Sequence, residues 1–289
     1  MAKTTAQAFS EFSESLKPTA AQKEVIAGRR ESVVSYLTEY FGSTSDMPLI
    51  SARLIGSASR ATMIRPLEDI DVLAIFEHTN VWRRYKQDSR SLLYRVRDAL
   101  DKYQVKIVGS RGQAVRLFYV AAPYVDITPV FRRQGGGYFL PAGDGKWLTT
   151  DPDSNDKFLS KRNQELGFHL KPFSRMLKQW NRVHSNRLRG FHLEVMGQAV
   201  FKSLGSNYRA AFKLFYQLAP RVLHVADPAG HSGDLARRLT TTQERQVIKS
   251  FSMAHERAGK ALDAESKDNH QEAIRLWTLV FGDEFPGFD

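Results

Sequence analysis

The sequence lacks cysteine altogether, which excludes disulfide bonds and thiolate metal sites. It also lacks any run approaching the roughly 18 apolar residues that a helix needs to cross a membrane. Residues 1–17 are polar with scattered phenylalanines, and they do not carry the apolar stretch of a secretory signal. Together these absences favour a cytoplasmic protein with no membrane association.

Negative charge is scarce, with 31 Asp and Glu residues against 42 Lys and Arg residues, so the formal net charge is +11. An excess of positive charge favours anionic partners such as nucleotides, nucleic acid or an acidic membrane surface. A solvated basic surface without a specific partner would account for the same excess. Nucleic acid is therefore compatible with the composition but is not required by it.

The hydrophobic pattern changes near Asp151, and this change predicts two domains, residues 1–150 and 151–289. The first part contains both strand-like and helix-like hydrophobic patterns. Its strands are predicted at 53–56, 69–76, 114–120, 124–130 and 138–140. Its helices are predicted at 5–16, 18–41 and 81–103. The second part shows helical spacing only, at 156–166, 168–183, 190–204, 207–222, 241–264 and 267–281. The chain is therefore expected to have an α+β fold.

Two aspartates, Asp69 and Asp71, stand one residue apart at the start of an apolar run. Burying a carboxylate costs several kcal/mol unless another group compensates its charge. On a strand, residues i and i+2 point the same way, so both carboxylates leave the same face. Asp126 is a third acid that stands alone in a later apolar strand. Carboxylate oxygens are the ligands that Mg²⁺ prefers, so the three side chains are candidate metal ligands.

An apolar strand runs into Gly56 and Ser57 just before this aspartate pair. A Gly-Ser turn offers backbone N–H groups and a hydroxyl to a triphosphate. A Gly-Ser turn, an Asp-x-Asp pair and a distant Asp on another strand form the pattern of nucleotidyltransferases of the DNA polymerase beta type. In that arrangement three carboxylates can hold two metal ions.

The predicted helix 168–183 carries an apolar stripe and a separate basic stripe. The basic stripe consists of Lys171, Arg175, Lys178 and Arg182. Four cations in a row repel one another unless water or an anion compensates them. The stripe is therefore either a solvated face or a triphosphate clamp that faces the three aspartates, with Lys178 as the leading phosphate contact.

A longer ordered set of motifs resembles the bacterial cGAS/DncV-like nucleotidyltransferases (CD-NTases), which make cyclic oligonucleotide second messengers in antiphage signalling. The motifs that carry the resemblance are Gly56–Ser57 and residues 64–73, 125–131, 147–152, 177–181, 191–194, 227–230 and 277–286. The Gly-Ser and Asp-x-Asp pair is moderately specific for the superfamily. The ordered set, which spans nearly the whole chain, is far more specific for this family.

The resemblance implies a polymerase-beta-like catalytic lobe with a mixed sheet, followed by an all-helical lobe of the oligoadenylate-synthase type. It implies that Asp69, Asp71 and Asp126 hold two Mg²⁺ ions, with Mn²⁺ as the alternative. It also implies that Gly56, Ser57 and Lys178 bind the phosphates of nucleoside triphosphates such as ATP. A regulatory protein partner is compatible with the resemblance.

One departure from the family pattern concerns Gly190, because relatives often carry there a serine that helps to hold the triphosphate. The phosphate contact made by that serine is either lost in this chain or made by the backbone.

The activity implied is the joining of ribonucleoside triphosphates into a cyclic di- or trinucleotide with release of pyrophosphate. One alternative is a transferase that adds nucleotides to RNA, like CCA-adding or poly(A)-type enzymes. Another is an inactive nucleotide sensor on the same fold. The presence of all three carboxylates argues against the sensor, since decay of such a site usually removes one of them.

Overall fold

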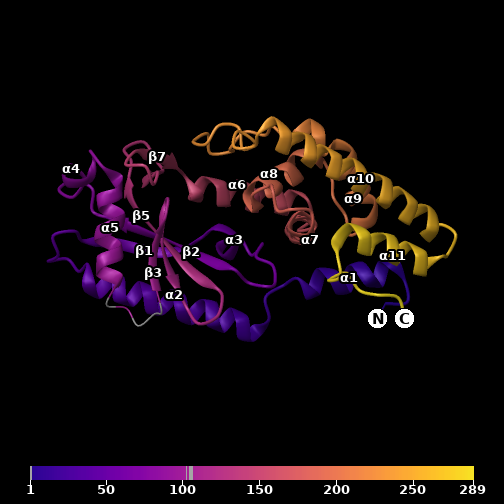
Figure 1. The fold of residues 1–289 in the computed structure, drawn as a ribbon, viewed down its shortest axis with the longest axis horizontal. Helices are drawn as coiled ribbons and strands as arrows, with labels where there is room; N and C mark the ends of the chain where they lie inside the picture. Colours follow the sequence, from indigo (N-terminus) through magenta and orange to yellow (C-terminus); the bar gives the residue numbers. More distant parts are fainter. Residues whose placement is uncertain (1, 102, 104–106) are drawn as a thin grey trace. The chain divides into compact units, whose positions relative to one another are not determined.

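The computed structural model describes residues 2–101, 103 and 107–289, and the chain divides into two compact units (Figure 1). Unit 1 contains Met1–Lys17, Thr62–Arg65 and Lys157–Asp289. Unit 2 contains Pro18–Ala61 and Pro66–Asp156. Each unit is thus assembled from segments that are distant in the sequence.

Unit 2 is built on a mixed sheet, as the sequence predicts. Its strands are β1 (Leu49–Ile55), β2 (Asp69–Phe76), β3 (Ile107–Arg111), β4 (Ala114–Phe118), β5 (Tyr124–Arg132), β6 (Tyr138–Pro141) and β7 (Trp147–Thr150). The order is β1-β2-β5-β4-β3, with β6 paired to both β5 and β7. The β2–β5 pair is parallel and the other pairs are antiparallel. The sequence did not indicate β3 or β7 as strands.

The strand β2 is buried on both faces over most of its length, which explains its continuous apolar run. Ile70 and Val72 are completely buried on one face. Leu73 and Ile75 lie on the other face and pack in a cluster with Val130 of β5. The two aspartates are therefore the polar start of a strand that is otherwise held firmly in the core.

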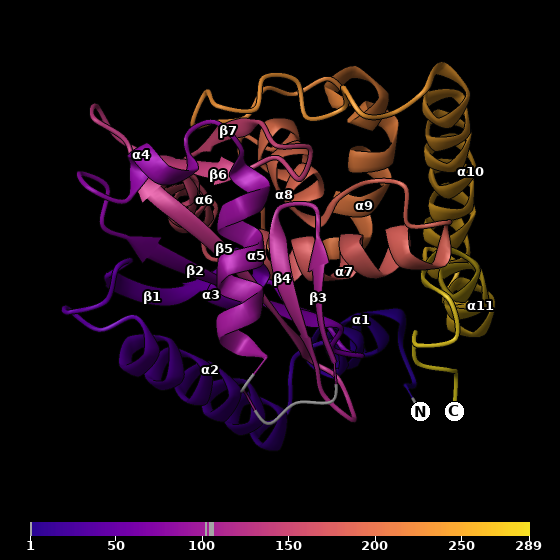
Figure 2. The same ribbon diagram turned by 60° about the vertical axis from the view of Figure 1, so that its left-hand side comes forward.

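Unit 2 also contains the helices α2 (Ala20–Tyr40), α3 (Gly56–Ser59), α4 (Trp82–Tyr85) and α5 (Ser89–Leu100). Figure 2 shows α5 in front of the sheet, where it contacts β3, β4, β5 and β6. The sequence predicted one helix over 81–103, of which residue 102 lies outside the described residues, but the described part of this range contains two. Asp88 is the reason, because its carboxylate accepts a hydrogen bond from the Arg90 backbone N–H and begins a new helix there.

Unit 1 contains the helices α1 (Thr5–Ser15), α7 (Leu170–Val183), α8 (Gly190–Val200), α9 (Tyr208–Leu218), η1 (Ala219–Val222), α10 (Thr241–Glu265) and α11 (His270–Phe281). The unit boundary falls within α6 (Pro152–Glu165). An aromatic core holds the unit together, for example through Phe173 stacked on Phe212 with ring centroids 4.4 Å apart. Among the described residues, no helix is both long enough and apolar enough to cross a bilayer.

The position of α1 differs from the predicted division at residue 150, because α1 belongs to the helical unit. The rings of Phe9 and Trp277 form a T-shaped pair with centroids 4.9 Å apart. Phe12 lies 4.9 Å from Phe281 and 5.1 Å from Phe285. The apolar face of α1 is thus buried against the C-terminal helix α11 and the residues that follow it, rather than against the sheet.

Candidate active site

The three aspartates singled out by the sequence lie on one face of the sheet of unit 2. Strands β2 and β5 run parallel, and Asp71 pairs directly with Asp126. Paired residues on neighbouring strands point to the same face, and Asp69 shares this face because it is two residues before Asp71. The structure therefore brings the three carboxylates together, while their role as metal ligands stays a prediction.

Arg116 also belongs to this cluster, and the sequence did not reveal it. In the antiparallel pair of β4 and β5, Arg116 stands opposite Asp126. Its Nη2 atom donates to Oδ2 of Asp69 and to Oδ2 of Asp126, both at 2.5 Å, and its Nε atom donates to Oδ1 of Asp126 at 2.6 Å. The two Oδ2 atoms share one nitrogen, so they lie at most twice that distance apart.

The pKa values of the cluster reflect its burial first and its excess of negative charge second. Burial raises the pKa of Asp71 to about 7, with further contributions from the charges of Asp69 and Asp126. The pKa of Asp69 is also raised, mainly by burial and then by Asp126, while Arg116 opposes the rise. Hydrogen bonds to Asp126 raise the pKa of Arg116. A divalent cation would relieve this repulsion.

The chemistry of these donors suits a hard divalent cation such as Mg²⁺ or Mn²⁺, because every donor is a carboxylate oxygen. As the side chains stand, no group of three His, Cys, Asp or Glu residues in the described part of the chain is arranged to hold a metal ion. The Arg116 guanidinium lies between Asp69 and Asp126 instead. The donor atoms are thus of the type that such a cation prefers, but their present arrangement is set by the guanidinium between Asp69 and Asp126.

The Gly-Ser turn lies directly beside this cluster. Ile55, the last residue of β1, pairs with Asp71, and Gly56 begins α3 with φ +73°. A Cβ atom at Gly56 would collide with the Asp71 carboxylate, so glycine is required for both the backbone conformation and the contact. Ser57 follows in the first turn of α3 and is half-buried. Its contact with a phosphate stays a prediction.

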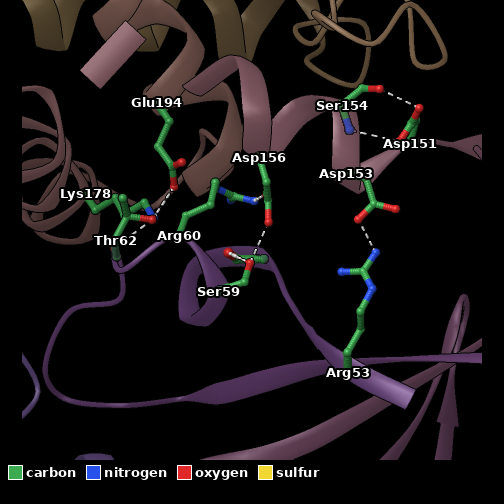
Figure 3. Close-up of polar contacts among 11 residues, drawn as sticks. Arg53, Ser59, Arg60, Thr62, Asp151, Asp153, Ser154, Asp156, Lys178 and Glu194 are labelled. Atoms are coloured by element: carbon green, nitrogen blue, oxygen red, sulfur yellow. Dashed lines mark hydrogen bonds and ion pairs between the residues drawn. The ribbon is translucent and has the colours of Figure 1, made fainter. Parts of the chain in front are cut away.

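Ion pairs and hydrogen bonds fasten α3 to the start of α6. Arg60 is 7% exposed, and its Nη1 atom lies 2.9 Å from Oδ1 of Asp156. The Ser59 hydroxyl donates to the other oxygen of Asp156 at 2.8 Å (Figure 3). These contacts hold the turn that contains Gly56 and Ser57.

Lys178 belongs to unit 1, where its ammonium group is held by Glu194 and Thr62 (Figure 3). Its Nζ atom lies 2.6 Å from Oε1 of Glu194 and donates to the Thr62 carbonyl at 2.9 Å and to the Thr62 hydroxyl at 3.1 Å. The Thr62 hydroxyl donates in turn to Oε1 of Glu194 at 2.7 Å. The structure thus gives Lys178 a buried carboxylate partner, and its predicted phosphate contact stays a prediction.

The basic stripe on α7 is not the solvated face that was one of the two interpretations. Arg175 is only 6% exposed, and burial lowers its pKa. Arg182 donates to the Arg65 carbonyl at 2.7 Å. Near Lys178, a Cβ atom at Gly190 would lie 3.0 Å from its Cε atom. A serine at this position would therefore press on the end of the Lys178 side chain.

Residues 3–163 match the family described as the Second Messenger Oligonucleotide or Dinucleotide Synthetase domain (SMODS). This match covers more than half of the chain. The chain belongs to the SMODS family. The predicted family and the predicted α+β fold are thereby confirmed, and the match supports cyclic oligonucleotide synthesis by a nucleotidyltransferase.

The SMODS chain is also similar to individual proteins over most of its length. It is 26% identical over 273 residues to a protein of Bacillus cereus (strain VD146) named "Probable cyclic nucleotide synthase", covering 81% of this chain and 82% of that one. It is 26% identical over 257 residues to the cyclic AMP-AMP-AMP synthase of Acinetobacter sp. (strain ATCC 27244 / 9458), covering 81% and 72%. Its fold matches E. coli MS115-1 CdnC, solved in a CdnC:HORMA-deltaN complex, with a TM-score of 0.81, 20% identity and 98% coverage of both chains.

Proposed function

We propose that this protein joins ribonucleoside triphosphates into a cyclic di- or trinucleotide second messenger, using the carboxylates of Asp69, Asp71 and Asp126. The observation that carries the proposal is the convergence of these three side chains on one sheet face beside the Gly-Ser turn. The family match and the two synthases of similar sequence support the same reaction.

The residues of unit 2 have distinct roles in this proposal. Asp69, Asp71 and Asp126 would hold two Mg²⁺ ions, or Mn²⁺ ions, on the face where their charges now repel one another. When bound, such ions neutralise the triphosphate and activate an attacking hydroxyl. The backbone of Gly56 and the hydroxyl of Ser57 would bind phosphate oxygens next to Asp71. Gly56 thereby keeps the phosphates close to the carboxylates.

The chemical step is an in-line displacement at the α-phosphorus. A bond forms between a ribose hydroxyl oxygen and the α-phosphorus of the next nucleotide. The bond from that phosphorus to the oxygen that bridges the α- and β-phosphates breaks, and pyrophosphate leaves. The protein contributes positioning and a fixed electrostatic environment, which are the main sources of rate in such transfers. Repetition of the step lengthens the product, and a final attack within the same molecule closes the ring.

The setting of the reaction is also part of the proposal. The resemblance to CD-NTases supports a role in antiphage signalling, and the need for nucleoside triphosphates supports a cytoplasmic location. E. coli CdnC, which has the same fold, was solved with a HORMA-deltaN partner. This complex supports a regulatory protein partner for the present chain. Lys178 would contact a phosphate, and for this its ammonium group would have to exchange one of its present acceptors.

The test is product analysis by mass spectrometry after incubation with Mg²⁺ and all four ribonucleoside triphosphates, without an acceptor. A phosphatase-resistant cyclic product is expected, and the double substitution Asp69→Asn with Asp71→Asn should abolish it. Asp98→Asn with Asp101→Asn, on the exposed end of α5 and the residue after it, is a charge-matched control that should leave synthesis intact. Unchanged synthesis in the Asp69 and Asp71 variant would refute the assignment. Product formation only after addition of RNA would favour the nucleotide-adding alternative.

A further inference from the structure

Arg116 makes strong contacts with two of the three proposed metal ligands. Its guanidinium engages both oxygens of Asp126 and, through Nη2, one oxygen of Asp69, all at 2.5 to 2.6 Å. Two-pronged contacts between a guanidinium and a carboxylate are among the strongest hydrogen bonds in proteins. The side chain of Arg116 is only 12% exposed, so solvent screens these contacts weakly. The guanidinium is therefore a firmly held part of the cluster.

The oxygens that bind Arg116 are those that a divalent cation would use. Mg²⁺ lies about 2.1 Å from a carboxylate oxygen, so an ion on Oδ2 of Asp126 would be less than about 5 Å from Nη2 of Arg116. Two cations at this separation repel each other strongly in a partly buried site. Ion binding and the present position of the guanidinium therefore oppose each other.

The register of the sheet determines which part of Arg116 can move. The backbone of β4 is paired with β5 at Arg116 and on both sides of it, with Val115 opposite Ile127 and Leu117 opposite Val125. The main chain is thus fixed, and only rotation of the long side chain can carry the guanidinium away from the carboxylates. Such a rotation leaves the positions of Asp69 and Asp126 on their strands unchanged.

We propose that Arg116 is a resident counter-cation of the site, which holds Asp69 and Asp126 together without divalent ions and withdraws when such ions bind. This inference rests on the proposed function for the identity of the metal ligands. Arg116 is in this sense a positioning residue, because it acts through the two carboxylates. Its removal should make the carboxylates more available to a cation, whereas a purely structural arginine would not affect cation affinity in this direction.

The test is the affinity of the full-length, nucleotide-free protein for Mn²⁺, measured by electron paramagnetic resonance of the unbound ion. The variant Arg116→Gln should bind Mn²⁺ roughly tenfold more tightly than wild type, because the ion no longer has to break charge-assisted hydrogen bonds. Arg116→Lys keeps the charge but loses the two-pronged contact with Asp126. Its affinity for Mn²⁺ should therefore lie between those of wild type and Arg116→Gln. Arg53→Gln is the matched control, since it removes a guanidinium of β1 that pairs with Asp153 and changes the net charge equally.

A second measurement is thermal unfolding in a chelator and again in Mn²⁺, where Mn²⁺ should raise the midpoint of Arg116→Gln more than that of wild type. Equal or weaker Mn²⁺ binding by Arg116→Gln overturns the inference about Arg116. If wild type still makes a cyclic product, that result leaves the proposed function standing. If neither protein binds Mn²⁺, both the metal-ligand assignment and the role of Arg116 fail. An equal gain in Arg53→Gln would also overturn the inference, because the effect would then follow net charge alone.

Discussion

The ion pair between Lys178 and Glu194 predicts a large difference between single and double substitutions in unit 1. Glu194 is 1% exposed, and the side chain of Lys178 is 11% exposed. The Nζ–Oε1 distance is 2.6 Å, and Thr62 provides the further hydrogen bonds given above. Both charges are therefore removed from water, and each compensates the other at close range.

The size of the effect follows from what each substitution leaves behind. Glu194→Leu removes the carboxylate that lies 2.6 Å from the buried ammonium, and this should lower the free energy of unfolding by about 3–5 kcal/mol. Lys178→Met leaves a buried carboxylate and should cost a similar amount. The double variant removes both charges and keeps the volume, so it should unfold within about 1–2 kcal/mol of wild type. The two single costs should therefore fail to add.

The assay is urea unfolding followed by tryptophan fluorescence, because Trp180 and Trp277 are buried in unit 1 and report on its core. The exposed pair Lys260–Glu256 on α10 is the control, and its single substitutions should each change the free energy of unfolding far less, because water screens both charges. Costs of Glu194→Leu and Lys178→Met that simply add in the double variant would refute the reasoning. A cost below about 1 kcal/mol for Glu194→Leu would refute it as well.

Two further predictions concern a turn and a histidine. In chemical unfolding, Gly56→Ala should lower the free energy of unfolding by about 1–3 kcal/mol more than Gly112→Ala does. Both glycines have positive φ, but only a methyl group at position 56 would meet the Asp71 carboxylate. Equal costs of the two substitutions would contradict this. The Nδ1 atom of His224 donates a hydrogen bond to the Asp234 carboxylate at 2.7 Å, and this bond raises the pKa of His224 above 6.5. The stability that it adds is therefore present below pH 6.5 and is lost as the pH rises through the raised value. An NMR titration should show this raised pKa and its return toward 6.5 in Asp234→Asn; an unchanged pKa in that variant would contradict the cause.

The strand that carries the aspartate pair was predictable because its signal is local. The run from Asp69 to Phe76 is apolar after its first three residues, and the observed strand β2 has the predicted bounds. Burial on both faces requires such a run, and two carboxylates at its start require compensation from elsewhere. Strands were also predicted at 114–120 and 124–130, and the structure pairs them as the antiparallel strands β4 and β5.

The sequence did not show that Arg116 is the group that compensates the aspartates, because this depends on the register of β4 against β5. The antiparallel pairing of Arg116 with Asp126 requires the hairpin to be centred on residue 121. A turn centred one residue later would place Thr128 opposite Arg116 and leave the aspartate with another neighbour. The sequence contains both residues and the turn between them, but the position of the turn decides whether they meet.

The helical unit shows the same limit for contacts between distant segments. Helical spacing correctly separated the apolar side of α7 from its basic side, but spacing does not identify what a basic side chain meets. Lys178 meets Glu194 from α8 and Thr62 from a segment that precedes β2, so its partners lie 16 and 116 positions away. A buried cation needs an anion wherever it lies, and a carboxylate of the same chain satisfies this need as well as a phosphate does. A cation on a helix therefore predicts a nearby anion, and only the tertiary structure distinguishes a structural partner from a substrate.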